Sequence, residues 1–150
     1  MTSSDGRCYE GQWCDNLRQG TGRMTWLDGS CYDGEWVNDQ FENEGTYLWA
    51  NASKYVGSWH KGERSGPGRM TYANGSEYTG EWKSDMRWGK GVMTYKDEII
   101  YDGEYCKNKR HGEGSMTWKT TGHSYVGRWV NDAREGQGTY TWPDQSVYTG

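Results

Sequence analysis

The chain has 150 residues, a hydrophobic fraction of 32% and a formal net charge of −4. Disordered chains lack aromatic residues, and here these reach 15%, so we expect a folded protein. The acidic balance argues against nucleic-acid binding. No apolar run is long enough for a membrane span or a signal peptide. We therefore expect a soluble cytoplasmic protein without nucleic-acid partners.

One nine-residue phrase recurs along the chain and begins with a tyrosine each time, as in YEGQWCDNL from residue 9 and YDGEWVNDQ from residue 32. The period is 23 residues, except for a spacing of 24 before the sixth copy. The extra residue lies in KTTGHS (119–124), which we expect to be a turn. Six copies start at Tyr9, Tyr32, Tyr55, Tyr78, Tyr101 and Tyr125, and another begins at Tyr148. A fixed period of this length is typical of repeat architectures.

Each repeat predicts two strands, because apolar or small residues alternate with polar ones in both halves. Five or six polar residues separate the halves, and Asp-Gly or Asn-Gly turn signals follow the second. In chain order the predicted strand pairs are 9–13 with 20–26, 32–36 with 43–49, 55–59 with 66–72, 78–82 with 89–95, 101–105 with 112–118 and 125–129 with 136–142. No window has a helical apolar period. We therefore predict an all-β chain of hairpins joined edge to edge, in a single domain over residues 1–150.

The glycines of the second half lie on the same face as the aromatic residues, and we expect neighbouring rings to cover the backbone there. Five positions depart from the pattern. Asn43 stands where the other repeats begin the second half with Gly, and Tyr105 where they have Trp. Ala52, Glu98 and Gln145 occupy a turn position that is Gly elsewhere. We expect those turns to be strained or of another type.

The motif YDGEWxxxxxxGxGxMTYxDGS resembles the membrane occupation and recognition nexus (MORN) repeat over essentially the whole chain. The resemblance implies an elongated, twisted, single-layer array of hairpins with an aromatic groove. At roughly 10 Å per hairpin, six hairpins would span about 60 Å. It also implies a non-enzymatic scaffold that binds protein partners in cytoskeletal, ciliary, flagellar or membrane-associated structures. The alternatives are a phosphoinositide-binding module and a docking segment of a larger enzyme whose catalytic part lies elsewhere.

The residues predict no catalytic, cofactor or metal site. His60, His111 and His123 occupy three different repeat positions. His60 occupies the same repeat position as Cys14 and Cys106, and residues at one repeat position are called a column here. Neighbours in a column would lie about 10 Å apart, too far for two ligands of one zinc. An intermolecular site between two arrays stays open. The same spacing argues against disulfides, so we expect free thiols in a reducing compartment.

Aromatic residues that line the expected groove are the candidate partner-binding residues. Most should form the core, because a single layer has no other apolar material, while some must remain partly accessible. Trp88 lies outside the repeat columns, so we expect it to make a contact on assembly. The candidates are Tyr32, Trp36, Tyr55, Trp59, Tyr78, Trp82, Trp88, Tyr101 and Trp129.

Arginine occupies one position before the second strand in five of the six repeats, and Phe41 replaces it in the second repeat. These five residues, called the arginine column below, are Arg18, Arg64, Arg87, Arg110 and Arg134. These side chains could meet acidic phospholipid headgroups. Alternatively they pack over rings and pair with acids, for which the candidates are Asp15, Asp39, Asp85 and Asp132. The net negative charge favours the structural role, so we expect weak phospholipid binding at best.

The chain begins on the tail of one repeat, DGRC (5–8), and stops at YTG (148–150), so it reads as a segment of a longer array. Open strand edges pair readily with other chains. We therefore expect a homodimer formed through an end repeat.

Overall fold

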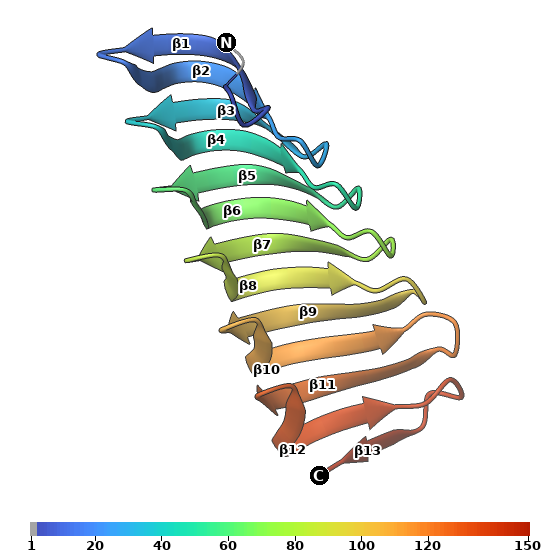
Figure 1. Ribbon diagram of the computed structural model, residues 1–150. Helices are drawn as coiled ribbons and strands as arrows, with labels where there is room; N and C mark the ends of the chain where they lie inside the picture. Colours follow the sequence, from blue (N-terminus) through green and yellow to red (C-terminus); the bar gives the residue numbers. More distant parts are fainter. Residues whose placement is uncertain (1–2) are drawn as a thin grey trace. The chain divides into compact units, whose positions relative to one another are not determined.

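The computed structural model describes residues 3–150, where all regular structure is β-strand (Figure 1). Within each of the two compact units defined below, successive strands pair antiparallel in sequence order. The all-β class is confirmed. Among the described residues no helix is long and apolar enough to cross a membrane. The strands are β1 (Cys8–Cys14), β2 (Leu17–Thr25), β3 (Cys31–Val37), β4 (Gln40–Leu48), β5 (Lys54–His60), β6 (Glu63–Thr71), β7 (Glu77–Lys83), β8 (Met86–Thr94), β9 (Ile99–Cys106), β10 (Lys109–Trp118), β11 (His123–Val130), β12 (Ala133–Thr141) and β13 (Val147–Thr149).

The strands fall into two compact units. The first unit comprises Met1–Ala73 with Lys83–Asp85, and the second comprises Asn74–Trp82 with Met86–Gly150. The first contains β1 to β6 and the turn that follows β7, and the second contains most of β7 and all of β8 to β13. Each contact described below joins residues of the same unit.

The strands within each repeat are joined by very tight turns. In the second repeat only Asn38 and Asp39 separate β3 from β4, and both have positive φ, at 48° and 69°. Two successive positive φ values are typical of a type I′ hairpin, whose twist matches that of the strands. The polar stretch between the two halves of a repeat is therefore mostly strand.

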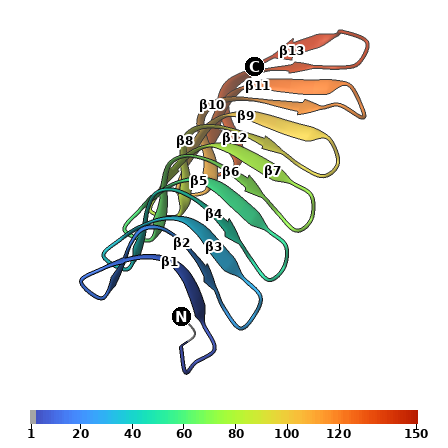
Figure 2. The same ribbon diagram turned by 90° about the horizontal axis from the view of Figure 1, so that it is seen from above.

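A bulge follows the first glycine of several repeats, as between Gly11 and Trp13 and between Gly34 and Glu35. A bulge adds an unpaired residue to one strand and bends it. The hairpins seen from above are accordingly bent rather than flat (Figure 2).

Paired glycines make the space for the tyrosine core. Gly34 on β3 faces Gly45 on β4, and a Cβ on Gly34 would lie 2.5 Å from the Gly45 Cα. A Cβ on Gly45 would lie 2.5 Å from Cε2 of the Tyr32 ring. The Tyr32 side chain is fully buried, and its hydroxyl donates to the Glu35 carbonyl at 3.0 Å. The expectation that rings cover the glycine backbone is confirmed.

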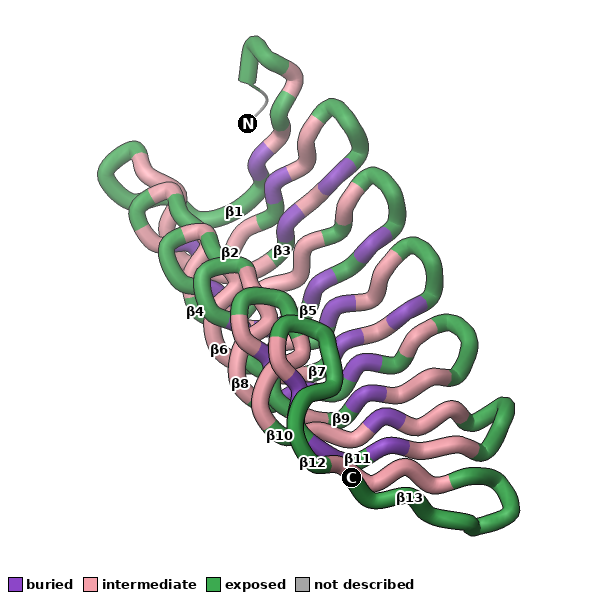
Figure 3. Tube along the Cα trace, turned by 90° about the horizontal axis from the view of Figure 1, so that it is seen from below, coloured by how far each residue is buried: buried purple, intermediate pink, exposed green. Residues whose placement is uncertain are grey.

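Tryptophans in the first strand of a repeat pack against the preceding repeat and donate a hydrogen bond to it. The Trp36 indole meets the Tyr9 and Tyr32 rings edge to face, at centroid distances of 5.4 and 5.2 Å. Its Nε1–H donates to the Gly22 carbonyl at 2.9 Å. Trp59 repeats the same bond to Gly45. The buried positions therefore recur at the same place in the first strand of successive repeats, from the second repeat onward (Figure 3).

The unusual turn residues adopt the conformation of the glycines that they replace. Ala52, Glu98 and Gln145 have φ values of 69°, 57° and 66°, where Gly29 has 87°. Residues with a Cβ are strained in this left-handed region. The expected strain is confirmed, and the turns keep the same type.

The extra residue before the sixth repeat lies in the turn, as expected. Gly122 closes this turn with φ of 73°, and its amide donates to the Trp118 carbonyl at 2.8 Å. The facing glycines Gly114 and Gly127 stay in register across β10 and β11.

Candidate functional site

The two faces of the hairpins differ in chemistry. One carries the aromatic residues and the arginine column and is called the aromatic face below. The opposite face carries mainly polar residues with isolated exposed valines, such as Val56 and Val126, which are 44% and 54% exposed. The aromatic face is the candidate binding surface, because buried and half-buried rings gather there.

The structure buries eight of the nine candidate groove residues. Each of these eight is at most 5% exposed, namely Tyr32, Trp36, Tyr55, Trp59, Tyr78, Trp82, Tyr101 and Trp129. They form the core of the repeats, and a direct role in partner binding stays a prediction.

Trp88 is partly buried on β8, directly after Arg87. At the same position of other repeats, Gln19 and Glu42 accept backbone amides from the turn of the following hairpin. Trp88 therefore occupies a position next to a hairpin turn. Its role in assembly stays a prediction.

A cluster of half-buried rings lies on the aromatic face of the first unit, and the sequence reasoning missed it. Phe41 stacks on the buried Tyr32 ring at 3.8 Å. The Trp26 ring centroid lies 6.2 Å from that of Phe41 and 5.5 Å from that of Tyr47. The ring centroids of Tyr47 and Trp49 lie 4.6 Å apart. These four rings (Trp26, Phe41, Tyr47 and Trp49) are called the ring cluster below. Phe41 was the available signal, because it breaks the arginine column.

The arginine column is built into the structure by a repeated clamp. The backbone amide and the Nε of Arg18 both donate to Asp39 Oδ1 at 2.8 Å, and its Nη2 donates to the Asp39 carbonyl at 3.3 Å. The guanidinium also lies 4.5 Å from the Trp36 ring centroid. Donation from the Arg18 amide and guanidinium holds the pKa of Asp39 below its ordinary value. The clamp joins one hairpin to the turn of the next.

The same clamp recurs between Arg64 and Asp85 and between Arg110 and Asp132, with Nε to Oδ1 distances of 2.9 and 3.0 Å. Three of the four candidate acids therefore pair with the arginine column, as the structural alternative expects. The fourth, Asp15, accepts a weak bond from the Cys14 thiol at 3.8 Å.

Phe41 and its partner position change together. In the turn that follows, Gly62 occupies the position at which Asp39 pairs with Arg18. The Gly62 amide donates to the Phe41 carbonyl at 3.0 Å. Glu42 replaces the missing clamp by accepting the Lys61 amide at 2.8 Å and lying 2.6 Å from His60 Nδ1. The Lys61 amide, and then His60, hold the pKa of Glu42 below its ordinary value.

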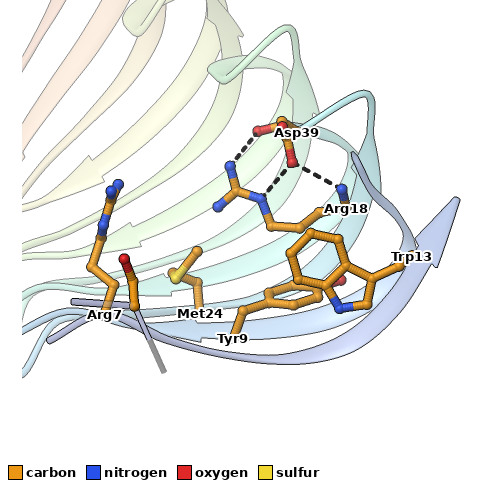
Figure 4. Close-up of a pocket in the computed structure, with 7 residues that line it drawn as sticks. Arg7, Tyr9, Trp13, Arg18, Met24 and Asp39 are labelled. Atoms are coloured by element: carbon orange, nitrogen blue, oxygen red, sulfur yellow. Dashed lines mark hydrogen bonds and ion pairs between the residues drawn. The ribbon is translucent and has the colours of Figure 1, made fainter. Parts of the chain in front are cut away.

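Two hollows open on the aromatic face, each within one unit. The first, of about 430 Å³, includes Tyr9, Trp13 and Arg18 in its wall (Figure 4). Trp13 is 48% exposed there, whereas Trp36 at the same repeat position is 1% exposed. The second hollow, of about 480 Å³, lies in the other unit beside Tyr125, Arg134 and Tyr140.

The histidines and cysteines stay dispersed. The Tyr140 hydroxyl lies 2.8 Å from His123 Nδ1, and His111 Nδ1 is buried without a hydrogen-bond partner among residues 3–150. All four cysteines are unpaired. Within the described part of the chain, no three metal-ligating side chains gather. The chemistry on the aromatic face is therefore that of aromatic rings and arginine side chains.

Comparison with solved structures shows the fold. The TCP domain of SAS-4 (dCPAP) from Drosophila melanogaster, in complex with a proline-rich motif of dSTIL, is 12% identical, with a TM-score of 0.59. That match covers 99% of this chain and 80% of the other. The TCP10c domain of Drosophila melanogaster Sas-4 is 11% identical, with a TM-score of 0.54 over 99% of this chain and 88% of that one. No curated protein matches the sequence.

The MORN repeat family model matches residues 9–31, 32–54, 55–77, 78–98, 101–122 and 125–147. These matches cover nearly the whole chain and follow the tyrosine-initiated hairpins described above. The chain belongs to the MORN repeat family.

Proposed function

We propose that this chain is a non-enzymatic protein-interaction module, which holds an extended peptide segment on its aromatic face and so acts as a scaffold. The ring cluster carries the proposal, because half-buried aromatic rings that contact one another supply large apolar area at low entropic cost. Aromatic-lined surfaces are a common way to hold proline-rich segments. The TCP domain of similar fold was solved with a proline-rich motif, which supports a peptide of this type as the first to test.

A comparative pull-down tests this function. The bait variant Trp26→Ser/Trp49→Ser removes two half-buried rings of the aromatic face, and Val56→Ser is the matched control on the opposite face. We expect the double variant to lose a partner, identified by mass spectrometry, that the wild type and the control both retain. Circular dichroism must show that all three baits are folded. Loss of the partner only with Val56→Ser would refute the proposal.

Phospholipid binding is the second candidate, and we propose that it is weak at best. Three guanidiniums of the column already donate to aspartates, so a headgroup would have to displace a carboxylate. Liposome flotation with and without phosphoinositides tests this. Tight, salt-sensitive flotation that disappears in Arg64→Glu/Arg87→Glu/Arg110→Glu would instead favour the lipid function.

Cytoplasmic location on cytoskeletal, ciliary or flagellar structures is proposed from the family resemblance, and fluorescence microscopy of the tagged protein tests it. Service as a docking segment of a larger enzyme is compatible with the same binding face. A homodimer also stays a prediction. Light scattering should report about twice 17.3 kDa, and a monomer mass across a hundredfold concentration range would refute it.

A further inference from the structure

One clamp of the arginine column differs from the others. Arg87 meets Asn108 where Arg18, Arg64 and Arg110 each meet an aspartate. The Asn108 amide oxygen accepts the Arg87 backbone amide at 2.9 Å, and the Asn108 carbonyl accepts Nη2 at 2.8 Å. The backbone of the clamp is therefore unchanged, but the acceptor carries no negative charge.

This exchange leaves the Arg87 charge without a carboxylate. Within residues 3–150 Arg87 makes no ion pair, and its Nε lacks the bond to the turn side chain that Arg18 and Arg110 make. The guanidinium is partly buried and stays on the aromatic face, 5.8 Å from the Tyr78 ring centroid and 5.3 Å from that of Tyr105. The guanidinium is therefore held in place, while its Nε–H has no acceptor among the described residues.

We propose that Arg87 is a specificity-determining contact for an acidic partner, and that a Glu or Asp side chain of an extended peptide segment binds its guanidinium. A carboxylate from the partner would supply the negative charge that an aspartate supplies elsewhere in the column. Charge-assisted bonds to a planar guanidinium are strong and directional, and a fixed donor loses little entropy on binding. The inference rests on the protein-binding function proposed above and concerns only the aromatic face of the second unit, where Arg87 lies.

Arg134 differs from the other four arginines, because it has no turn side chain as its acceptor among the described residues. It lies over the Trp118, Tyr125 and Tyr140 rings and makes no ion pair within the described residues. The acceptors of the other arginines lie 21 or 22 residues further along the chain, and residues 3–150 include no such position for Arg134, so Arg134 is left out of the comparison.

Two peptides that differ in one charge test the proposal. The probes are Ac-Pro-Pro-Glu-Pro-Pro-amide and its Gln analogue, followed through the arginine Nε–H signals in ¹H–¹⁵N spectra. We expect the Glu peptide to shift the Arg87 signal and to bind about fivefold more tightly than the Gln peptide, since a charged acceptor adds about 1 kcal/mol. The Arg18, Arg64 and Arg110 signals should not respond.

Two reciprocal variants separate this role from a structural one. Asn108→Asp supplies the missing carboxylate within the chain, so it should raise the Tm and abolish the response of Arg87. Asp132→Asn frees the Arg110 guanidinium, so it should create a new response at Arg110. A merely structural arginine would change the stability in these variants without exchanging the binding responses.

Several results would overturn the inference. They are equal affinity for the two peptides, no shift of the Arg87 signal, an undiminished response in Asn108→Asp, or a response to inorganic phosphate but not to the Glu peptide. The two proposals can fail separately. If the Trp26→Ser/Trp49→Ser bait loses its partner while the Glu and Gln peptides bind equally, the protein-binding function stands and the role of Arg87 falls.

Discussion

Removing one hydroxyl group should stabilise this protein. Tyr105 replaces the Trp of its column, is 4% exposed, and has a buried hydroxyl without a hydrogen-bond partner among the described residues. The indoles of Trp36 and Trp129 at the same position donate to glycine carbonyls at 2.9 and 3.2 Å. A buried polar group without a partner costs about 1 to 3 kcal/mol. Tyr105→Phe should therefore stabilise the fold by about that amount.

A neighbouring tyrosine on the same strand is the matched control. The Tyr101 hydroxyl is buried and donates to the Glu104 carbonyl at 2.9 Å. Tyr101→Phe removes the same atom but breaks this bond, and should destabilise the fold by about 0.5 to 1.5 kcal/mol. Calorimetry and urea unfolding measure both changes, and 1 kcal/mol corresponds to about 2 to 4 °C in Tm for a chain of this size. A lower Tm for Tyr105→Phe, or a change of Tm in the same direction in both variants, would show that the buried Tyr105 hydroxyl does not destabilise the fold.

Three further predictions concern the turns, the buried tyrosines and the core. Ala52→Gly should stabilise the fold by about 0.5 to 1 kcal/mol, because relief of a left-handed φ of 69° outweighs the added chain entropy; a lower urea midpoint would contradict this. Burial raises the pKa of Tyr32 and Tyr101 above the ordinary value, so stability that is complete below about pH 10 should fall above it, by up to about 1.4 kcal/mol per pH unit for each ring. Equal urea midpoints at pH 8 and 11 would contradict that loss. Trp59→Ala should cost about 3 to 5 kcal/mol, while Lys61→Ala should change the unfolding free energy by less than about 0.5 kcal/mol; equal midpoints for the two variants would show that Trp59 is not core.

The hairpins and their register could be predicted from the sequence, because the pattern and the packing have the same cause. Gly34 and Gly45 face each other so that the Tyr32 ring can cover them, and both glycines and the tyrosine recur with the period of the repeat. The insertion before Tyr125 could be placed in a turn for the same reason, because any other position would shift the glycine pairs.

The binding surface could not be read in the same way, because it depends on how adjacent hairpins meet. The clamp from Arg18 to Asp39 joins residues that are 21 positions apart, and the alternation within strands gives no indication of it. Once that pairing is known, the joint change to Phe41 and Gly62 and the exchange of aspartate for Asn108 become visible in the sequence. Exposure of the rings was also unpredictable, because bulges and bends decide which rings neighbouring repeats cover.

Site-specific photocrosslinking would show directly whether partners bind the aromatic face. The photoreactive residue p-benzoylphenylalanine would replace Trp49 on the aromatic face or, in a separate sample, Val56 on the opposite face. After irradiation with the partner found by pull-down, we expect crosslinks from position 49 and none from position 56. Crosslinks from position 56 alone would contradict this.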